Sequence, residues 1–218
     1  MLKKAIGYML LALFFLPSFT YSGLNVDVDL GVDVNIGDDD LHMRINAHYF
    51  EKDPEYVKSV VRKHKMFDYY PIVLFLSYHS KKDVDFIVSM RKQGLSWWEI
   101  SLQLGVPVSA YYLDVGLKPV GPPYGKAYGY WKKYKKNPKY KFKLTDEQVF
   151  DLISLKMISS YYSMDPERVI NMRKSGIKFK HIITNQYWQH RASPGKSKEK
   201  GNNKGKVTAK NKNKGKKK

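Results

Sequence analysis

A repeated helical unit is the feature that most constrains how this chain can fold. Residues 53–55 and 165–167 both read Asp-Pro-Glu, an order typical of a helix start with an aspartate N-cap. Residues 83–85 are a weaker copy. Aligning Asp83 with Asp165 gives six identities in eighteen positions, with further apolar matches. The sequence therefore predicts three related helical units.

Each unit reads as a helix, a stop and a second helix. Gly94 and Gly176 follow identical Met-Arg-Lys segments and suit the position just after a helix end, where the backbone takes a positive φ. His64 stands at this position in the first unit. Residues 96–99 and 145–148 have the Ser/Thr-x-x-Glu/Gln pattern of a capping box, which predicts that a helix starts at each.

Apolar helices are expected before the second and third units, at residues 71–79 and 145–161. We expect Trp97 and Trp98 to pack against neighbouring units rather than to form a ligand platform, because the third unit has phenylalanine and lysine in their places. The predicted core residues are Ile72, Leu74, Phe75, Leu76, Leu152, Ile153, Leu155 and Ile158.

Two alternating segments predict a β-hairpin ahead of the units. Residues 25–36 place an apolar side chain at every second position, residues 37–40 read as a turn, and residues 41–49 alternate again. If Ile36 pairs with Leu41, acidic side chains of the first strand face basic ones of the second. The edge of this hairpin could pair with a partner protein.

The first 22 residues have the order of a secretory signal peptide. Lys3 and Lys4 precede an uncharged stretch that ends at Leu16, and small residues stand at positions 20 and 22. This apolar run is shorter than the roughly 20 residues of a membrane span; an uncleaved anchor is the alternative. The chain has no cysteine, which excludes disulfides and a lipidated cysteine. We expect an exported protein that is periplasmic, associated with the outer membrane or extracellular.

The opposite end of the chain is strongly basic. Residues 191–218 contain twelve Lys or Arg and one Glu, a net charge of +11 out of +19 for the whole chain. Loss of Lys3 and Lys4 with the signal peptide would leave +17, so the part between carries about +6. A segment of this composition is expected to be disordered. It suits a polyanion or an anionic membrane surface as partner, or it serves only to keep the protein soluble.

A basic aromatic segment separates the second and third units. Residues 115–143 contain nine lysines, no acid and several Gly and Pro, which indicates a loop. Aromatic rings beside cations can stack on bases or sugars while the lysines hold an anionic backbone. The alternative is that the tyrosines cover the helical core and the lysines are only solvated. The candidate polyanion-binding residues are Tyr124, Lys126, Tyr128, Tyr130, Trp131, Lys132, Lys133, Tyr134, Lys135 and Lys136.

Other functional classes find little support. Residues 94–107 resemble the start of a helix-turn-helix, but the next helix, 109–117, lacks the Arg, Asn or Gln that reads bases. The six histidines form no zinc-binding motif, and the Asp run at 38–40 does not fit a calcium loop. No catalytic motif is present. We therefore expect no metal, no cofactor and no enzymatic activity; an enzyme whose site is assembled only by the fold is the alternative.

Three motifs carry a resemblance. The Gly-Asp-Asp-Asp turn at 37–40, the Gly-Leu-Ser-Trp-Trp segment at 94–98 and the Gly-Pro-Pro-Tyr-Gly-Lys-Ala-Tyr-Gly-Tyr segment at 121–130 look like those of a group of uncharacterised exported proteins of Gram-negative bacteria. The resemblance spans residues 26–188 and implies an envelope location, with no known activity.

Together these patterns predict a mainly α protein. An N-terminal β-hairpin (23–50) precedes a compact array of three helical repeat units (51–105 and 145–190), with a basic Tyr/Gly/Pro-rich insertion (106–144) and a disordered C-terminal tail (191–218). The leading functional hypothesis is binding of an anionic envelope or extracellular polymer, such as nucleic acid, lipopolysaccharide or acidic glycan. The alternative is an assembly factor of the envelope that pairs through the hairpin edge.

Overall fold

The part of the chain that the structure describes is mainly helical, as predicted. The computed structural model describes residues 36–115, 120–121 and 123–192. The predicted signal peptide, the strand at 25–35 and the tail beyond 192 lie outside these residues. The helices are α1 (Asp38–Tyr49), α2 (Pro54–His64), α3 (Tyr70–Ser80), α4 (Val84–Lys92), α5 (Trp97–Gln103), the 3-10 turn η1 (Val108–Tyr111), α6 (Gly125–Lys136), α7 (Asp146–Tyr161), α8 (Pro166–Lys174) and α9 (Phe179–Arg191).

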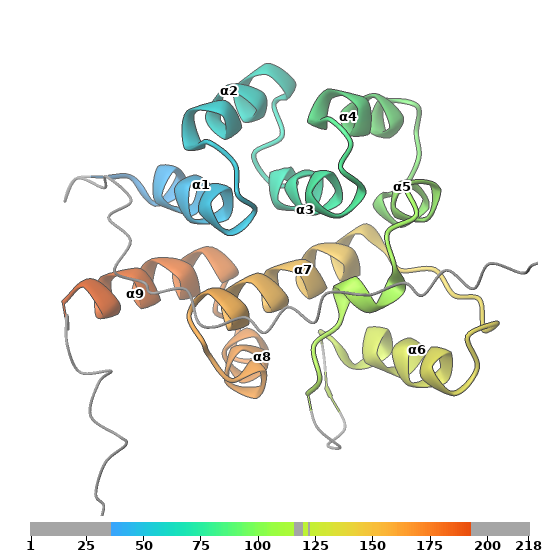
Figure 1. Ribbon diagram of the computed structural model, residues 1–218. Helices are drawn as coiled ribbons and strands as arrows, with labels where there is room; N and C mark the ends of the chain where they lie inside the picture. The colour runs from blue at the N-terminus through green and yellow to red at the C-terminus, as the bar shows by residue number, and fades with distance from the viewer. Residues whose placement is uncertain (1–35, 116–119, 122, 193–218) are drawn as a thin grey trace, which may run out of the picture.

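The helices stack in tiers around α7. Figure 1 shows α1, α3 and α5 in one tier, α2 and α4 on one side of it, and α9 and α7 on the other. α7 contacts α1, α3, α5, η1 and α8, and most of its residues are buried. α3 is buried continuously from Tyr70 to Ser77. A helix that is apolar on all sides must lie inside the array, which explains why the sequence of α3 shows no polar face.

One helix-turn-helix arrangement occurs three times. The contacting pairs α1 with α2, α3 with α4, and α7 with α8 each lead into a further helix, α3, α5 or α9. The first helix of each pair ends at a non-glycine residue with positive φ, and an N-cap aspartate follows two residues later. These pairs of positions are Glu51 and Asp53, Lys81 and Asp83, and Ser163 and Asp165.

The predicted helix starts and stops are largely confirmed. Residues 96–99 and 145–148 both form complete capping boxes. Gly94 and Gly176 have φ values of 90° and 83°. The first unit differs by one residue, because Lys65 rather than His64 has the positive φ. The side chains of the N-cap residues Asp53 and Asp165 accept a capping hydrogen bond from a backbone N–H. The side chain of Asp83, in the weaker copy, does not.

The second strand of the predicted hairpin is wrong, because residues 41–49 belong to α1. In the helix, Leu41 and Ile45 lie on one side and Met43 and Ala47 on the opposite side, and all four are buried because α1 packs against several other helices. The predicted turn is the acidic first turn of α1, where the helix dipole favours aspartate. Arg44 pairs with Glu55 of α2 at 3.3 Å. α1 is thus the first helix of the first unit.

Two arginines at equivalent positions, Arg91 of the second unit and Arg173 of the third, make equivalent contacts. The Arg91 guanidinium lies 4.8 Å from the ring centre of Trp97, donates to the Leu95 carbonyl at 2.9 Å and pairs with Asp146 of α7. Its counterpart Arg173 lies 4.4 Å from the Phe179 ring, donates to the Ile177 carbonyl at 3.0 Å and lies 3.6 Å from Asp151. Trp97 and Trp98 are buried, which confirms that both pack in the core.

Within the described residues, no helix combines the length and the apolar composition that crossing a bilayer requires.

Candidate functional site

The predicted basic loop contains a helix. The four-residue turn η1 stands where a recognition helix would have to begin, and residues 125–136 form α6. The expectation of a loop across this segment is therefore wrong. Glycines and prolines flank the helix, but within it Tyr124, Ala127, Tyr128 and Trp131 recur at helical spacing and face inward.

Buried tyrosines fix α6 to the rest of the fold. The Tyr112 hydroxyl donates to the Ala127 carbonyl at 3.1 Å, and the Tyr128 hydroxyl donates to the Leu113 carbonyl at 3.2 Å. The Tyr112 ring stacks on Trp131 with ring centres 4.7 Å apart. Burial raises the pKa of Tyr128 to about 12, so this hydroxyl keeps its proton and acts as a donor.

The close approach that begins α6 requires a glycine. A Cβ atom on Gly125 would lie 2.4 Å from the carbonyl oxygen of Val120, which is closer than any real contact of this kind. By contrast, a Cβ atom on Gly129 would meet nothing within 4 Å. The two glycines of one short motif therefore have different roles, and only Gly125 is required by packing.

Phe142 organises a second aromatic cluster beside α6. Its ring contacts those of Trp98, Tyr130, Tyr134 and Tyr140, with ring centres 5.2 to 6.1 Å apart. The Trp98 indole N–H donates to the Phe142 carbonyl at 3.1 Å. The extended segment after α6 is thereby held against α5. Most of the aromatic surface predicted for ligand stacking is used in these internal contacts.

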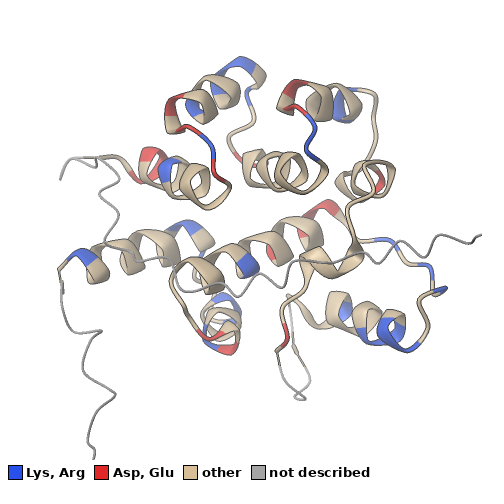
Figure 2. Ribbon diagram, viewed as in Figure 1, with Lys and Arg blue, Asp and Glu red and all other residues tan. Residues whose placement is uncertain are grey.

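The lysines of this region lie on the outside. Figure 2 shows Lys and Arg on α6 and on the segment leading to α7, with no acid between them. The exposed lysines are Lys126, Lys132, Lys133, Lys135, Lys136, Lys139, Lys141 and Lys143. Only Lys143 forms an ion pair with a described residue, at 2.9 Å from Glu99. We call the other seven the lysine surface.

Four members of the lysine surface, at positions 132, 133, 135 and 136, lie in the last turns of α6. The negative end of the helix dipole favours cations there, which offsets part of their mutual repulsion. Lys133 lies 5.5 Å from the ring centre of Tyr140, and Lys135 lies 5.7 Å from that of Trp131. These contacts leave the ammonium groups in solvent and available to an anion.

The structure divides the predicted site residues into two groups. All five predicted lysines, 126, 132, 133, 135 and 136, are exposed on one helix. Tyr124 and Tyr128 are buried, so the prediction that they stack on a ligand is wrong. Tyr130, Trp131 and Tyr134 are partly exposed but pack on each other, on Phe142 and on Tyr112. Lys139 and Lys141, which follow the predicted residues in the same basic segment, belong to the same surface.

Comparisons with protein-family models, with curated proteins and with solved structures give no match to this chain. Among the described residues, no group of three or more His, Cys, Asp or Glu side chains could hold a metal ion.

Proposed function

We propose that this is an exported, non-catalytic protein that holds an anionic polymer on the lysine surface and on its basic C-terminal tail. The observation that carries the proposal is a set of seven exposed lysines on α6 and residues 137–141 that pair with no described acid. Cations on a structured scaffold without counter-charges attract polyanions and release the counterions of the polymer. The predicted signal peptide supports an envelope or extracellular location.

The geometry favours recognition by charge over recognition of sequence. Aromatic stacking on bases or sugars needs free ring faces, and the rings beside α6 lie mainly against one another. What remains is a row of flexible ammonium groups, which bind phosphate, sulfate or carboxylate groups as point charges. The polymer is therefore defined by its charge density, and nucleic acid, lipopolysaccharide and acidic glycan are all within this class.

Salt dependence of binding to a labelled DNA oligonucleotide or to heparin tests the proposal. We expect log K to fall linearly with log salt, with a slope of about −0.7 to −0.9 for each neutralised phosphate of the DNA. Replacing Lys132, Lys133, Lys135 and Lys136 with Ala should reduce the steepness of this slope by about 3. Truncation after residue 192 should reduce it further.

A matched variant controls for net charge. Lys82, Lys92, Lys174 and Lys178 are exposed, form no ion pair with a described residue and lie on other helices or turns. Their replacement by Ala removes the same four charges from elsewhere. The proposal requires this variant to keep most of the affinity that the α6 variant loses. Equal losses in both variants, or unchanged retention of the α6 variant truncated after residue 192, would contradict it.

A further inference from the structure

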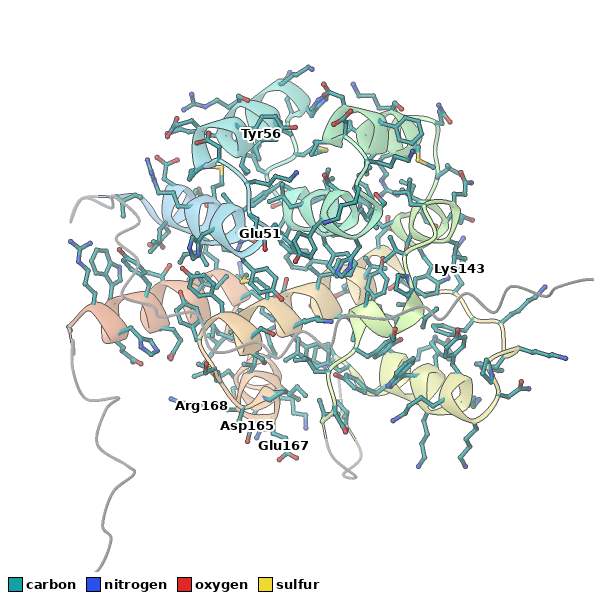
Figure 3. The ribbon with its side chains drawn as sticks, viewed as in Figure 1. Glu51, Tyr56, Lys143, Asp165, Glu167 and Arg168 are labelled. Atoms are coloured by element: carbon teal, nitrogen blue, oxygen red, sulfur yellow. The ribbon has the colours of Figure 1, made fainter. Side chains whose placement is uncertain are left out.

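A second site lies away from the lysine surface, where α1, α3 and α7 meet. A cavity of about 550 Å³ opens there, within the range of roughly 300 to 1,000 Å³ that is typical of small-molecule sites. Its walls come from the end of α1, from the second half of α3, from one side of α7 and from Leu113. Glu51, which is labelled between α1 and α3 in Figure 3, lies at its edge.

The body of the cavity is aromatic and aliphatic. Phe50, Phe75 and Ile153 lie beneath the lining and are almost fully buried, whereas Tyr49, Tyr78 and Leu113 are half-buried and present apolar surface to the cavity. The Phe50 ring lies edge-on to Phe75, with ring centres 6.4 Å apart, and 6.2 Å from Tyr78. Such walls favour an apolar ligand, because binding removes apolar surface of both the ligand and the cavity from water.

The polar groups of the cavity are mainly cationic. Lys156 of α7 donates to the Ala110 carbonyl at 2.6 Å and forms no ion pair with a described acid. Burial lowers the pKa of Lys156, because the surrounding groups do not fully replace the water that would solvate the charged ammonium group. Lys81 lies 4.6 Å from the ring centre of Tyr78. Glu51 is the one acid in the lining, so Lys81, Lys156 and Glu51 together give the cavity a net charge of +1.

His79 adds a neutral polar group. Burial, together with the charges of Lys156 and Lys81, lowers the pKa of His79 to about 4, so the imidazole is uncharged at neutral pH. Its ring lies 4.4 Å from that of Phe75, between the apolar wall and Lys156. A neutral imidazole can donate one hydrogen bond to an anion without adding charge to the site.

We propose that this cavity binds a small amphipathic carboxylate, with its apolar body against Tyr49, Tyr78 and Leu113 and its carboxylate on Lys156. The ligand supplies the single negative charge that the lining lacks, and it gives the half-buried ammonium a partner with which to form a charge-assisted hydrogen bond. A neutral ligand of the same shape fills the apolar space but leaves the ammonium group unpaired.

Calorimetric titration of the full chain with sodium decanoate and with decanol, below the concentration at which decanoate forms micelles, tests this site. Decanoate should bind about tenfold or more tighter than decanol, because only the carboxylate forms the charge-assisted hydrogen bond. Lys156→Met should remove this preference, whereas Lys92→Met, the same change at an exposed position on α4, should retain it. Ser160→Phe should fill the cavity and abolish binding of both ligands.

The outcomes separate this site from the lysine surface. The variant with four Ala substitutions on α6 should bind decanoate normally, and Lys156→Met should bind DNA normally. Equal affinity for decanoate and decanol, or no binding of either, would overturn the proposal. Decanoate binding that persists in both Lys156→Met and Ser160→Phe would also overturn it. The second variant is needed because the phenylalanine blocks the cavity whether or not the ligand requires the lysine.

Discussion

The helical units and the α6 segment use positive charge in opposite ways. In the units, cations connect one helix to another: Lys58 to Asp40, Arg91 to Asp146, and Lys180 to Asp39. On α6, the five lysines have no acidic partner among the described residues. Net charge alone therefore does not identify a binding surface. What distinguishes α6 and the segment after it is that seven lysines without an acidic partner in the described part of the chain stand together on residues 126–141, whereas the unpaired lysines of the units, such as Lys82 and Lys174, lie on separate helices and turns.

The sharpest test of this comparison is the loss of a cation that the fold uses. Arg173→Met should lower the free energy of unfolding by about 3 kcal/mol at pH 7, because it leaves the buried Asp151 without its partner and also removes the contact with the Phe179 ring and the hydrogen bond to the Ile177 carbonyl. Burial already raises the pKa of Asp151 to about 6. The loss should therefore shrink below pH 6, where this carboxyl is protonated in the folded state. Urea unfolding at pH 7 and pH 5 measures both effects.

Arg168 provides the control on the same helix. It is exposed on the outer side of α8 (Figure 3), and Arg168→Met should change the free energy of unfolding by less than about 0.5 kcal/mol. Similar losses for the two arginines would mean that the internal pairing is not what stabilises the third unit.

Acid should weaken the first unit through His42. Burial lowers the pKa of His42 to about 4, and its Nδ1 shares a hydrogen bond of 2.7 Å with the Tyr70 hydroxyl. Since the folded pKa is below the ordinary value of 6.5, the unfolded chain binds more protons between pH 4 and 6.5. The contribution of neutral His42 to the free energy of unfolding is complete above pH 6.5. It decreases by about 2 to 3 kcal/mol as the pH falls to 4.

The variant His42→Asn should flatten this part of the stability–pH curve, because its amide oxygen can accept the hydrogen bond but does not titrate. His181→Asn, at an exposed position of α9, is the matched change. Urea midpoints from pH 4 to 7 measure the slopes. If the His181 variant flattened the curve as much as the His42 variant, the buried hydrogen bond with Tyr70 would not be its cause.

The attachment of α6 can be tested without touching any charge. Gly125→Ala should destabilise the protein by about 1 to 3 kcal/mol, because the added methyl group meets the Val120 carbonyl. Gly129→Ala adds the same atom to an open position within the helix and should stabilise by about 0.5 to 1 kcal/mol. Thermal unfolding compares the pair. Equal effects would show that α6 does not depend on the close approach at its start.

The smallest effect on stability is expected for the lysine surface itself. Replacing lysines 132, 133, 135 and 136 with Ala should change the free energy of unfolding by less than about 0.5 kcal/mol, because alanine favours helix and no ion pair is lost. The same variant loses polymer binding in the experiment above. A strongly destabilised variant would place these lysines among the cations that the fold needs.

The helical starts and stops could be predicted because they depend on local chemistry. The capping boxes at 96 and 145, and the positive φ of Gly94 and Gly176, follow from hydrogen bonds and sterics within a few residues. The buried pair Trp97 and Trp98 could be predicted as well, because the repeat supplied a comparison.

α1 could not be read from its own residues, because strict alternation is the pattern of a strand, whereas in this helix it places apolar residues on two opposite sides. Contacts with α2, α7 and α9 decide between them, and these depend on the whole array. A signal was nevertheless available. Residues 49–55 read Tyr-Phe-Glu-Lys-Asp-Pro-Glu and residues 161–167 read Tyr-Tyr-Ser-Met-Asp-Pro-Glu, which indicates that the same helix end precedes both units.

The site was predictable in its charges and not in its aromatic rings. Lysine is nearly always exposed, so the lysine surface follows from composition. Whether Tyr124 or Tyr134 faces a ligand depends on which side of α6 meets η1 and Phe142, and this is set by packing. The cavity beside Lys156 has no local pattern at all, because its walls come from three helices that are distant in sequence.

The contact of α1 with α9 joins the first and last helices of the array and determines how far the end of α9 lies from α6. It brings residues 36 and 192 to one edge of the fold, and Figure 1 shows α6 at the opposite edge. The tail therefore departs from the side farthest from the lysine surface. A short anionic oligomer on the lysine surface lies far from residue 192, whereas a long chain that spans the breadth of the protein can also reach the point where the tail begins. Length discrimination would then arise from geometry alone, since the second attachment becomes intramolecular.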